Sequence, residues 1–296
     1  MANLKALSSR IRSVKNTKQI TKAMKMVSAA KLRRAQERAF AARPYSQAMG
    51  RMMGALTVGG AMAGAPPLMA GRGGPVKRVE LVVFTADRGL CGSFNSGVIR
   101  AVRTKIAELT EAGQTVTLTF VGRKAHDVLK RQFSKNVRAV HIGLSRGLTF
   151  QVAEERVAGG LLDAFHRDEF DLCLAVYNTF QSAMQHTLTW RQLMPLPIPE
   201  TADDTAPASG MGGEYEPSGE EVLAALLPKN VAVQIFQAMV ESDASEHGAR
   251  MTAMDNAVRN ADEMVRKLTI TFNRTRQAAI TTELMEIISG AESLKG

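Results

Sequence analysis

The segment Thr85 to Asn95 is the part of the chain that most resembles a phosphate-binding loop. It follows the apolar run Val79 to Phe84 and contains Gly89 and Gly92. A phosphate loop needs several backbone amides turned inward by glycines, and a dinucleotide fingerprint needs three spaced glycines. The spacing here fits neither pattern. We therefore predict a structural turn that displays Arg88, with nucleotide binding as the weaker alternative.

Histidine and cysteine, which bind zinc or act in catalysis in many proteins, are scattered along the chain. Cys91 and Cys173 stand far apart in apolar surroundings, and the sequence contains no paired Cys/His motif and no Gly-x-Ser-x-Gly element. We therefore predict buried thiols in a reducing compartment and no catalytic, metal or cofactor site in this chain. The histidines are His126, His141, His166, His186 and His247.

Positive charge is concentrated at the start of the chain. The first 54 residues hold thirteen Lys or Arg and one acid, Glu37, so their net charge is +12. The rest of the chain has a net charge of −2, which gives the overall +10. Such a segment must meet an anionic partner, which is nucleic acid, a membrane surface or an acidic protein. Aromatic residues make up only 5% of the chain and none precedes Phe40, so bases would find few rings to stack on. A basic α/β protein that binds nucleic acid remains the alternative function.

The same segment has the apolar spacing of a coiled coil, in which steps of three and four residues alternate. We expect one helix from Asn3 to about Gly54, because no Gly or Pro precedes Pro44. The apolar row slips once, by a step of six residues where seven is regular. The row before the slip is Leu4, Leu7, Ile11 and Val14, and the row after it is Ile20, Ala23, Val27 and Ala30.

A second long helix is predicted from about Gly219 to Leu294, and its apolar row is the most regular in the chain. That row is Met251, Met254, Val258, Ala261, Val265, Leu268 and Phe272, and after Ala279 it shifts to Ile280, Leu284, Ile287, Ala291 and Leu294. Pairing the two helices antiparallel would bury both rows. The alternative is two separate helices that each pack on a globular core.

Between the helices, strand and helix patterns alternate. Apolar runs predict strands, and helical patterns separate them, as in an α/β sheet domain. The strands are expected at 79–84, 115–121, 137–142, 171–178 and 186–193, and the helices at 95–111, 123–133 and 150–165. The predicted fold is thus α/β, with a long antiparallel coiled coil of N- and C-terminal helices bracketing a Rossmann-like domain.

Two segments connect these parts. The uncharged stretch Met52 to Gly71 has nearly the length of a membrane span, but repeated Gly and Pro residues break helix, so we predict a linker. The start of the chain lacks the apolar core of a secretory signal. The predicted segments are the helix 1–54, the Gly/Ala/Pro-rich linker 55–76, the α/β domain 77–198, the acidic loop 199–221 and the helix 222–296.

Three motifs in order give the chain a family resemblance. The segments Met24 to Lys31, Asp87 to Gly92 and Asn273 to Thr281 resemble those of the γ subunit of rotary (F-type) ATP synthases, and the likeness covers essentially the full length. In that family the paired terminal helices form a shaft through a hexamer of α and β subunits. The α/β domain lies at its foot, against the ε subunit and the ring of c subunits.

The resemblance implies a noncatalytic rotor subunit that couples rotation of the c ring to conformational cycling of the catalytic β subunits. ATP, ADP and Mg would be bound by partner subunits and no cofactor by this chain. Nucleic acid would not be a partner. The subunit would be peripheral, on the cytoplasmic face of the bacterial inner membrane, and would reach the membrane only through its partners. No paired-cysteine insertion like that of chloroplast members is present, so thiol regulation is not predicted.

The resemblance also implies that seven residues contact the β subunits. Arg276 and Gln277 resemble the pair that engages a β loop near the top of the shaft, with Thr281 close by. Three cations, Lys31, Arg34 and Arg88, resemble those that approach an acidic lever region of β. Met24 occupies a position where the shaft meets β in that family.

Overall fold

The computed structural model describes residues 2–58, 66–197 and 219–293, and the chain divides into two compact units. The helical unit comprises Met1–Ser28 and Arg250–Gly296, and the sheet unit comprises Ala29–Ala249. Two helices, α1 (Ala2–Val58) and α7 (Gly219–Ser293), contribute residues to both units. The predicted fold class is confirmed.

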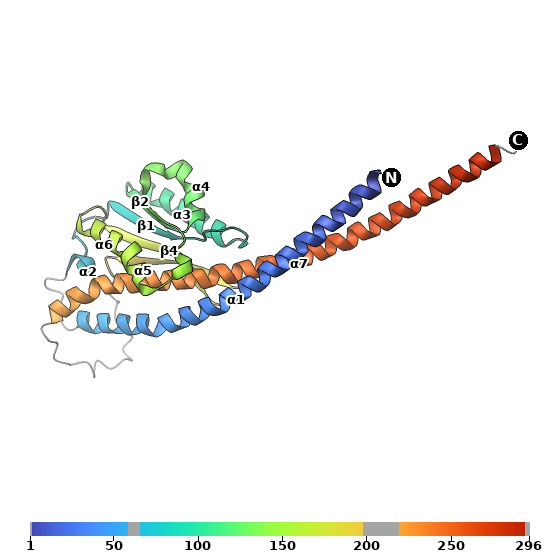
Figure 1. Cartoon of the computed structure of the whole chain (residues 1–296). Helices are drawn as coiled ribbons and strands as arrows, with labels where there is room; N and C mark the ends of the chain where they lie inside the picture. Colours follow the sequence, from blue (N-terminus) through green and yellow to red (C-terminus); the bar gives the residue numbers. More distant parts are fainter. Residues whose placement is uncertain (1, 59–65, 198–218, 294–296) are drawn as a thin grey trace. The chain divides into compact units, whose positions relative to one another are not determined.

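In the helical unit α1 and α7 lie side by side and run antiparallel (Figure 1). Lys18 pairs with Asp262, and the Nζ of Lys25 lies 2.5 Å from Oδ1 of Asp255. From Lys18 to Lys25 the chain advances seven residues along α1, and the partner residue moves back seven along α7, from Asp262 to Asp255, as antiparallel pairing requires. The predicted row on α7 is confirmed, since Met254 and Ala261 are buried and its five other members are half-buried.

The predicted slip in the apolar row of α1 is wrong. The covered positions continue from Val14 at regular steps of four and three residues through Lys18, Thr21 and Lys25 to the buried Ser28. Ile20 and Val27, which would form the shifted row, are 62% and 56% exposed. The two lysines can occupy this seam because Asp262 and Asp255 across it pair with their charges.

The second apolar row predicted on α7 is likewise exposed in the structure. Within the part of that row whose side chains are described, Ile280, Leu284, Ile287 and Ala291 are all exposed, and Leu294 lies outside the described residues. Among the described residues, α7 is the one helix that is long and apolar enough to cross a membrane. Half of its most apolar window is buried inside the protein, as happens in the core helices of soluble proteins.

In the sheet unit the same two helices are joined by an ion pair whose carboxylate is buried and whose arginine is half-buried. Nε and Nη2 of Arg43 donate to the two carboxylate oxygens of Glu241 at 2.9 and 3.2 Å. Ser46 Oγ donates to Oε1 of Gln237 at 2.6 Å. The pairing is again antiparallel. It extends along helices that continue through Pro44 and Pro228, and α1 ends at Val58, beyond Gly54.

The sheet has five strands in the order β3-β2-β1-β4-β5. The first four are parallel, and β5 is antiparallel to β4. Since β2 and β4 lie on opposite sides of β1, the strand order reverses at β1 as in doubly wound folds. The strands are β1 (Arg78–Phe84), β2 (Thr115–Val121), β3 (Val137–His141), β4 (Leu172–Phe180) and β5 (His186–Met194).

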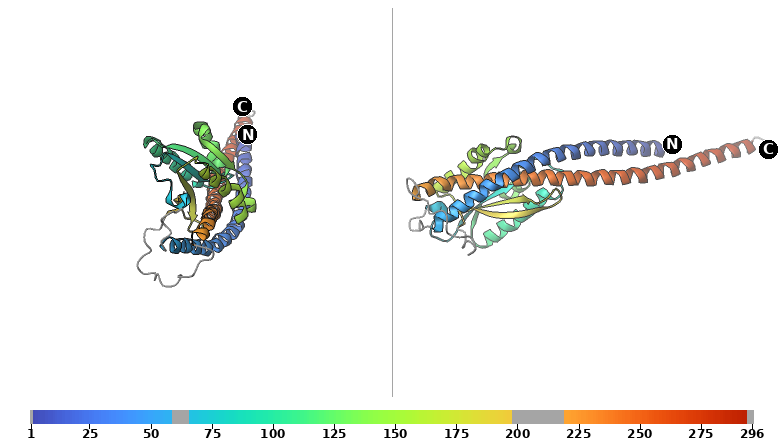
Figure 2. Two further views of the ribbon diagram at one scale, coloured as in Figure 1. Left: turned by 90° about the vertical axis from the view of Figure 1, so that its left-hand side faces the viewer. Right: turned by 90° about the horizontal axis from the view of Figure 1, so that it is seen from below.

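Helices cover both faces of this sheet (Figures 1 and 2). Along β1 the side chains alternate, so that Leu81 and Val83 pack under α3 and α4 while Val82 and Phe84 pack on the opposite face. That second face is covered by α5, α6 and parts of α1 and α7. The covering helices are α3 (Phe94–Glu111), α4 (Arg123–Phe133), α5 (Phe150–Ala153) and α6 (Gly159–His166).

Two connecting segments differ in detail from the sequence pattern. The predicted helix 150–165 is divided, because a π-helical turn, Glu154–Ala158, separates α5 from α6. The predicted linker contains the short helix α2 (Pro67–Ala70), whose Leu68 and Met69 are buried in the core. Residues 59–65 of that linker and 198–218, which include most of the predicted acidic loop, lie outside the described residues.

Asp171, just before β4, holds the start of β1 in place. Nη2 of Arg78 donates to its Oδ1 at 2.6 Å, and the backbone amides of Lys77 and Arg78 donate to its Oδ2 at 3.0 and 2.8 Å. The bond from the Arg78 side chain, aided by these amides, lowers the pKa of Asp171 to about 2 although partial burial acts in the opposite direction.

We predict that this carboxylate makes the sheet unit sensitive to acid. Because its folded-state pKa lies below the value of about 3.9 expected for an unfolded chain, its contribution is complete above about pH 4 and is lost as the pH falls through about 2. Asp171→Asn should lower the free energy of unfolding by about 1 kcal/mol at neutral pH, after allowance for solvent screening, and by almost nothing near pH 2.

Urea titrations followed by the fluorescence of Trp190, the single tryptophan, would measure this difference. Asp168→Asn is the control, because Asp168 also pairs with Arg78 but its side chain is 58% exposed, and we expect a smaller loss. Parallel pH profiles for wild type and Asp171→Asn would contradict the prediction.

Candidate functional site

The seven residues assigned to partner contact are divided between the two units. Four of them are in the helical unit, and three are in the sheet unit. The helical unit holds Met24, Arg276, Gln277 and Thr281, and the sheet unit holds Lys31, Arg34 and Arg88. The structure therefore presents two candidate surfaces, each carried by its own unit.

The surface on α7 is formed by neighbouring turns of the helix. Arg276, Gln277 and Thr281 are all exposed, and Thr281 Oγ1 donates to the backbone oxygen of Gln277 at 3.0 Å. Residues four apart share one helix face, so Gln277 and Thr281 lie on the same side. Met24 differs from these three, because it is half-buried in the seam and presents only part of its side chain.

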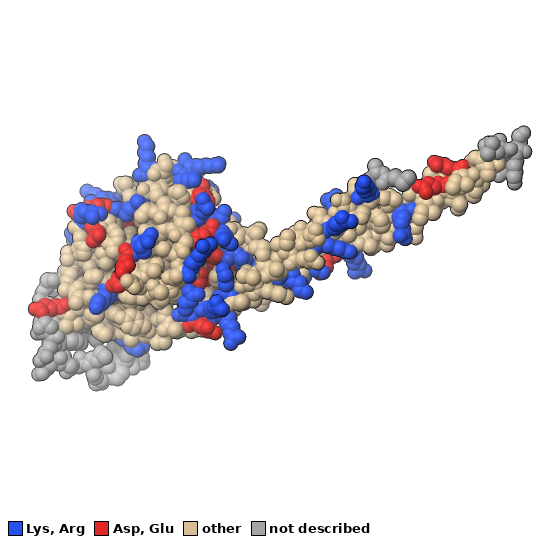
Figure 3. Space-filling model, in the orientation of Figure 1, with Lys and Arg blue, Asp and Glu red and all other residues tan. Residues whose placement is uncertain are grey.

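Lys31 and Arg34 lie one turn apart on α1 and are both exposed. Arg33 pairs with Glu37, the single acid of the basic segment, with 3.4 Å between Nε and Oε1. Among the described residues neither Lys31 nor Arg34 forms an ion pair. On the face shown in Figure 3, Lys and Arg side chains cover more of the surface than Asp and Glu side chains. The two cations are thus available to an acidic partner.

Arg88 lies in the loop between β1 and α3, where hydrogen bonds fix both ends of the turn. Oδ2 of Asp87 accepts from the amide of Gly143 at 2.9 Å, and its Oδ1 accepts from the amide of Arg123 at 3.2 Å. Asn95 Oδ1 accepts from the amide of Ala86 at 2.9 Å. The loop is therefore held by the start of α4, by the segment after β3 and by α3.

Cys91 anchors the second half of this loop. Its thiol is buried and receives a hydrogen bond from Nδ2 of Asn95 at 3.0 Å, and it packs with Ala86, Phe94 and Ala249. The prediction of two buried thiols is confirmed, because Cys173 is also buried, and burial followed by the charge of Glu80 raises its pKa well above the ordinary range. Arg88 is exposed, as the predicted turn requires.

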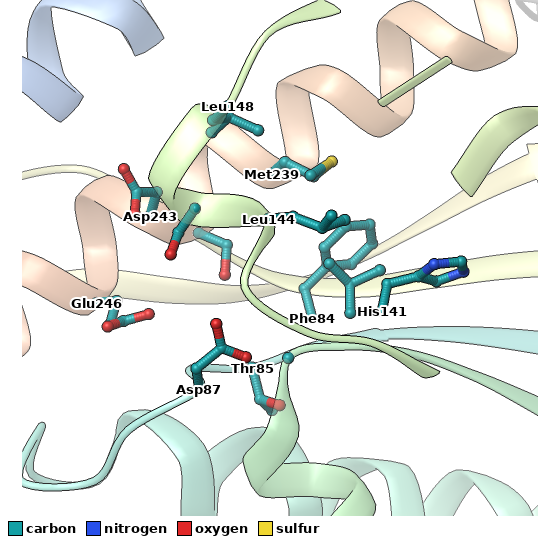
Figure 4. A pocket seen from close by; sticks show the side chains of 13 residues that line it. Phe84, Thr85, Asp87, His141, Leu144, Leu148, Met239, Asp243 and Glu246 are labelled. Atoms are coloured by element: carbon teal, nitrogen blue, oxygen red, sulfur yellow. The ribbon is translucent and has the colours of Figure 1, made fainter. Parts of the chain in front are cut away.

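A small pocket lies where the loop meets α7 (Figure 4). Asp87, Asp243 and Glu246 lie on one side of it, and Phe84 and Leu144 lie on the other. Its volume is about 40 Å³, which is far below the roughly 300 Å³ of a small ligand site. Among the described residues no group of His, Cys, Asp and Glu could hold a metal ion. That this chain binds no cofactor of its own stays a prediction.

His141, which also lines the pocket, has a lowered pKa, because burial and then the charge of Arg156 disfavour its protonated form. The ring is therefore neutral at neutral pH. Nothing in the sequence indicated this effect, since it arises from the burial of the end of β3.

Sequence patterns also missed one exposed residue of the loop. Leu90 is 65% exposed and has a backbone φ of +63°. The motif Asp87 to Gly92 predicted a turn, but it gave no sign that a leucine would adopt a conformation that glycine adopts most readily.

Comparisons with known proteins agree on one family. A family model described as ATP synthase matches residues 3–294. An ATP synthase gamma chain of Magnetococcus marinus is 60% identical over 298 residues, covering 100% of both chains. Another, of Rhodospirillum rubrum, is 53% identical over 303 residues, covering 99% of this chain and 100% of that one.

Solved structures share the fold. A chain of the Euglena gracilis mitochondrial ATP synthase, in a structure of OSCP, F1 and c-ring in rotational state 3, matches with a TM-score of 0.70 and 20% identity, over 99% of this chain and 95% of that chain. A chain of the Tetrahymena thermophila mitochondrial ATP synthase, in a structure of the central stalk and c-ring, matches with a TM-score of 0.60 and 24% identity, over 80% of this chain and 99% of that one.

We predict that Gly122 is essential for the position of the Arg88 loop. Its φ is +105°, and a Cβ there would lie 1.8 Å from the backbone oxygen of Thr85. Gly122→Ala should lower the free energy of unfolding by about 3 kcal/mol or more, because it adds a clash with backbone to an unfavourable φ. Denaturation followed by Trp190 fluorescence would measure it. Gly113→Ala is the matched control, because Gly113 has a φ of +75° but open space around it. Equal losses in the two variants would contradict the clash.

Proposed function

The chain belongs to the ATP synthase gamma-chain family, and we propose that it is the central shaft that couples rotation to ATP synthesis on partner subunits. The observation that carries this proposal is the match of residues 3–294 to the family, together with 60% identity to a gamma chain over the whole length. The antiparallel pairing of α1 and α7 supports it, because a rotor element must be stiff enough to transmit torque.

The proposed mechanism needs no active site in this chain. As an asymmetric shaft turns, it presents different surfaces to each catalytic subunit and shifts the populations of their conformations, and hence their affinities for nucleotide. The chain is thus a noncatalytic subunit, and ATP, ADP and Mg are bound by its partners. Proton flow through the c ring supplies the rotation.

The proposed partners are the hexamer of α and β subunits, the ε subunit and the c ring. The similar Euglena chain comes from a complex of OSCP, F1 and c-ring, and the similar Tetrahymena chain comes from a complex of central stalk and c-ring, which supports the assignment. Membrane association is indirect, on the cytoplasmic face of the bacterial inner membrane, because the chain would be tethered through the c ring.

The exposed cations supply the proposed contacts with β. Lys31, Arg34 and Arg88 face acidic segments of β, and Arg276 and Gln277, with Thr281 beside them, engage a β loop. Contacts between exposed charges steer and align partners more than they add affinity, so they can be exchanged at each step of rotation. Met24 contributes through the part of its side chain that the seam leaves uncovered.

The alternative of a nucleic-acid-binding protein is set aside by family membership. A tagged pull-down from membranes washed at low salt tests the choice directly. We expect one copy of the chain with three each of two nucleotide-binding subunits, by native mass. Recovery of nucleic acid without such subunits would overturn the proposal.

We predict that Arg276→Ala combined with Gln277→Ala lowers coupled ATP synthesis in inverted membrane vesicles at least severalfold. Both side chains are exposed, so the fold should be retained, and the chemistry of ATP cleavage should be untouched because it occurs on the partner. Arg266→Ala with Lys267→Ala is the matched control, since it removes two exposed cations from the same helix. Synthesis that is unchanged in the first variant, or reduced equally in both, would count against these contact residues.

A further inference from the structure

Arg191 is a half-buried cation on β5 that forms no ion pair within the part of the chain that the structure describes. Its Nη1 donates to Oε1 of Gln237 at 3.0 Å, and its Cζ lies 5.9 Å from the centre of the Tyr177 ring. The buried carboxylate of Glu241, one turn beyond Gln237 on α7, is already paired with Arg43. Because a guanidinium has several N–H donors, Arg191 can bind an anion in addition to Gln237.

The pocket that Arg191 lines contains polar side chains but no acid. Its volume is about 450 Å³, within the range of roughly 300 to 1,000 Å³ that is typical of small-ligand sites. Its walls come from α1, α2, β5, the segment after β5 and α7, and every lining residue belongs to the sheet unit. No Asp or Glu is among the described residues that line it. The one charge on its walls is therefore positive, and the pocket favours an anion.

Hydrogen bonds within the pocket use up acceptors and leave donors. Oε1 of Gln237 accepts from both Arg191 and Ser46, so the NH2 group of Gln237 is left to donate. Oδ1 of the buried Asn230 accepts from Nε2 of Gln234 at 3.3 Å, so the NH2 group of Asn230 is also left to donate. Arg191, Gln237 and Asn230 thus line one pocket with donors, which is the arrangement that binds an oxyanion.

A second part of the pocket wall is apolar. Met53, Met69 and Leu196 line it, and all three are buried. Methionine side chains adapt their shape to the group that packs against them. An apolar wall beside one guanidinium fits a ligand that has a single negative charge and a short hydrocarbon part. Inorganic phosphate has no hydrocarbon part to place there.

We propose that this pocket binds a small organic monocarboxylate. The carboxylate accepts hydrogen bonds from Arg191, Gln237 and Asn230, and the hydrocarbon part packs against the two methionines and Leu196. The inference goes beyond the proposed function and does not depend on it. Because the ligand contacts α1, α7 and β5 at once, its binding stabilises the sheet unit.

Calorimetric titration of the full chain with hexanoate tests the proposal. We expect saturable binding of one hexanoate per chain, and an unfolding midpoint that rises with the hexanoate concentration. Hexanol has the same hydrocarbon length without the charge, and inorganic phosphate has charge without the hydrocarbon. Each should bind roughly tenfold or more weakly than hexanoate.

Arg191→Gln removes the charge from the pocket. It should weaken hexanoate binding roughly tenfold or more, because a charge-assisted hydrogen bond to the carboxylate is lost. Arg131→Gln is the matched control, since Arg131 is exposed on α4 and is not a lining residue, while the overall charge of the chain changes equally. This control should bind hexanoate as wild type does.

Gly50→Leu fills the pocket without altering its donors. Gly50 lines the pocket from α1, and a Cβ there would meet nothing within 4 Å outside its own helix, so a leucine side chain has room to enter. Leucine favours helix more than glycine does, so the unfolding midpoint without ligand should be unchanged or higher, while hexanoate binding falls severalfold. Gly160→Leu, at an exposed position of α6 with equally open surroundings, should leave binding unchanged.

Failure of hexanoate to saturate would overturn the inference, and so would hexanol or phosphate binding as tight as that of hexanoate. Equal losses in Arg191→Gln and Arg131→Gln would also overturn it, because they would indicate attraction to the overall charge of +10. If Arg191→Gln does not fold, Gly50→Leu decides, since unchanged binding in that variant would place the ligand elsewhere.

Discussion

The buried carboxylate of Glu241 is the contact on which the organisation of the sheet unit depends. Its side chain is only 2% exposed, and it accepts hydrogen bonds from Arg43 of α1 and from the backbone amide of Phe180 at the end of β4. A buried charge is costly unless it is paired, so removing the Arg43 side chain would leave the carboxylate uncompensated. Glu241 of α7 thereby fixes the register of α1 and the position of the β4–β5 hairpin. In this arrangement α1 and α7 cover one face of the sheet.

The elements whose patterns are local were predictable from the sequence. The limits of β2 and α4 were predicted without error. The apolar pattern of the strand and the helical pattern of α4 each lie within a short stretch of neighbouring residues. The slip predicted after Val14 was wrong because the seam of α1 depends on residues far away in the sequence. Lys18 and Lys25 look like surface residues until Asp262 and Asp255, more than 200 residues later, are placed beside them.

The candidate surfaces show the same division. Sequence motifs identified Arg88, Arg276 and Gln277, and the structure places all three in exposed positions. Neither the half-buried state of Met24 nor the backbone of Leu90 could be read from the chain. The first depends on the opposite helix, and the second lies in a loop fixed by hydrogen bonds from the start of α4 and from Gly143 after β3, which a loop sequence does not reveal.

The polar seam of α1 also bears on how the chain is made. The helical unit joins residues before Ser28 to residues after Arg250, so its first helix leaves the ribosome long before its partner exists. A wholly apolar seam would invite two such nascent helices to pair with each other. Lys18 and Lys25 disfavour that, because a second copy would bring like charges together, whereas α7 supplies Asp262 and Asp255. The two lysines thus disfavour pairing of the first helix with a second copy before α7 of its own chain has been synthesised.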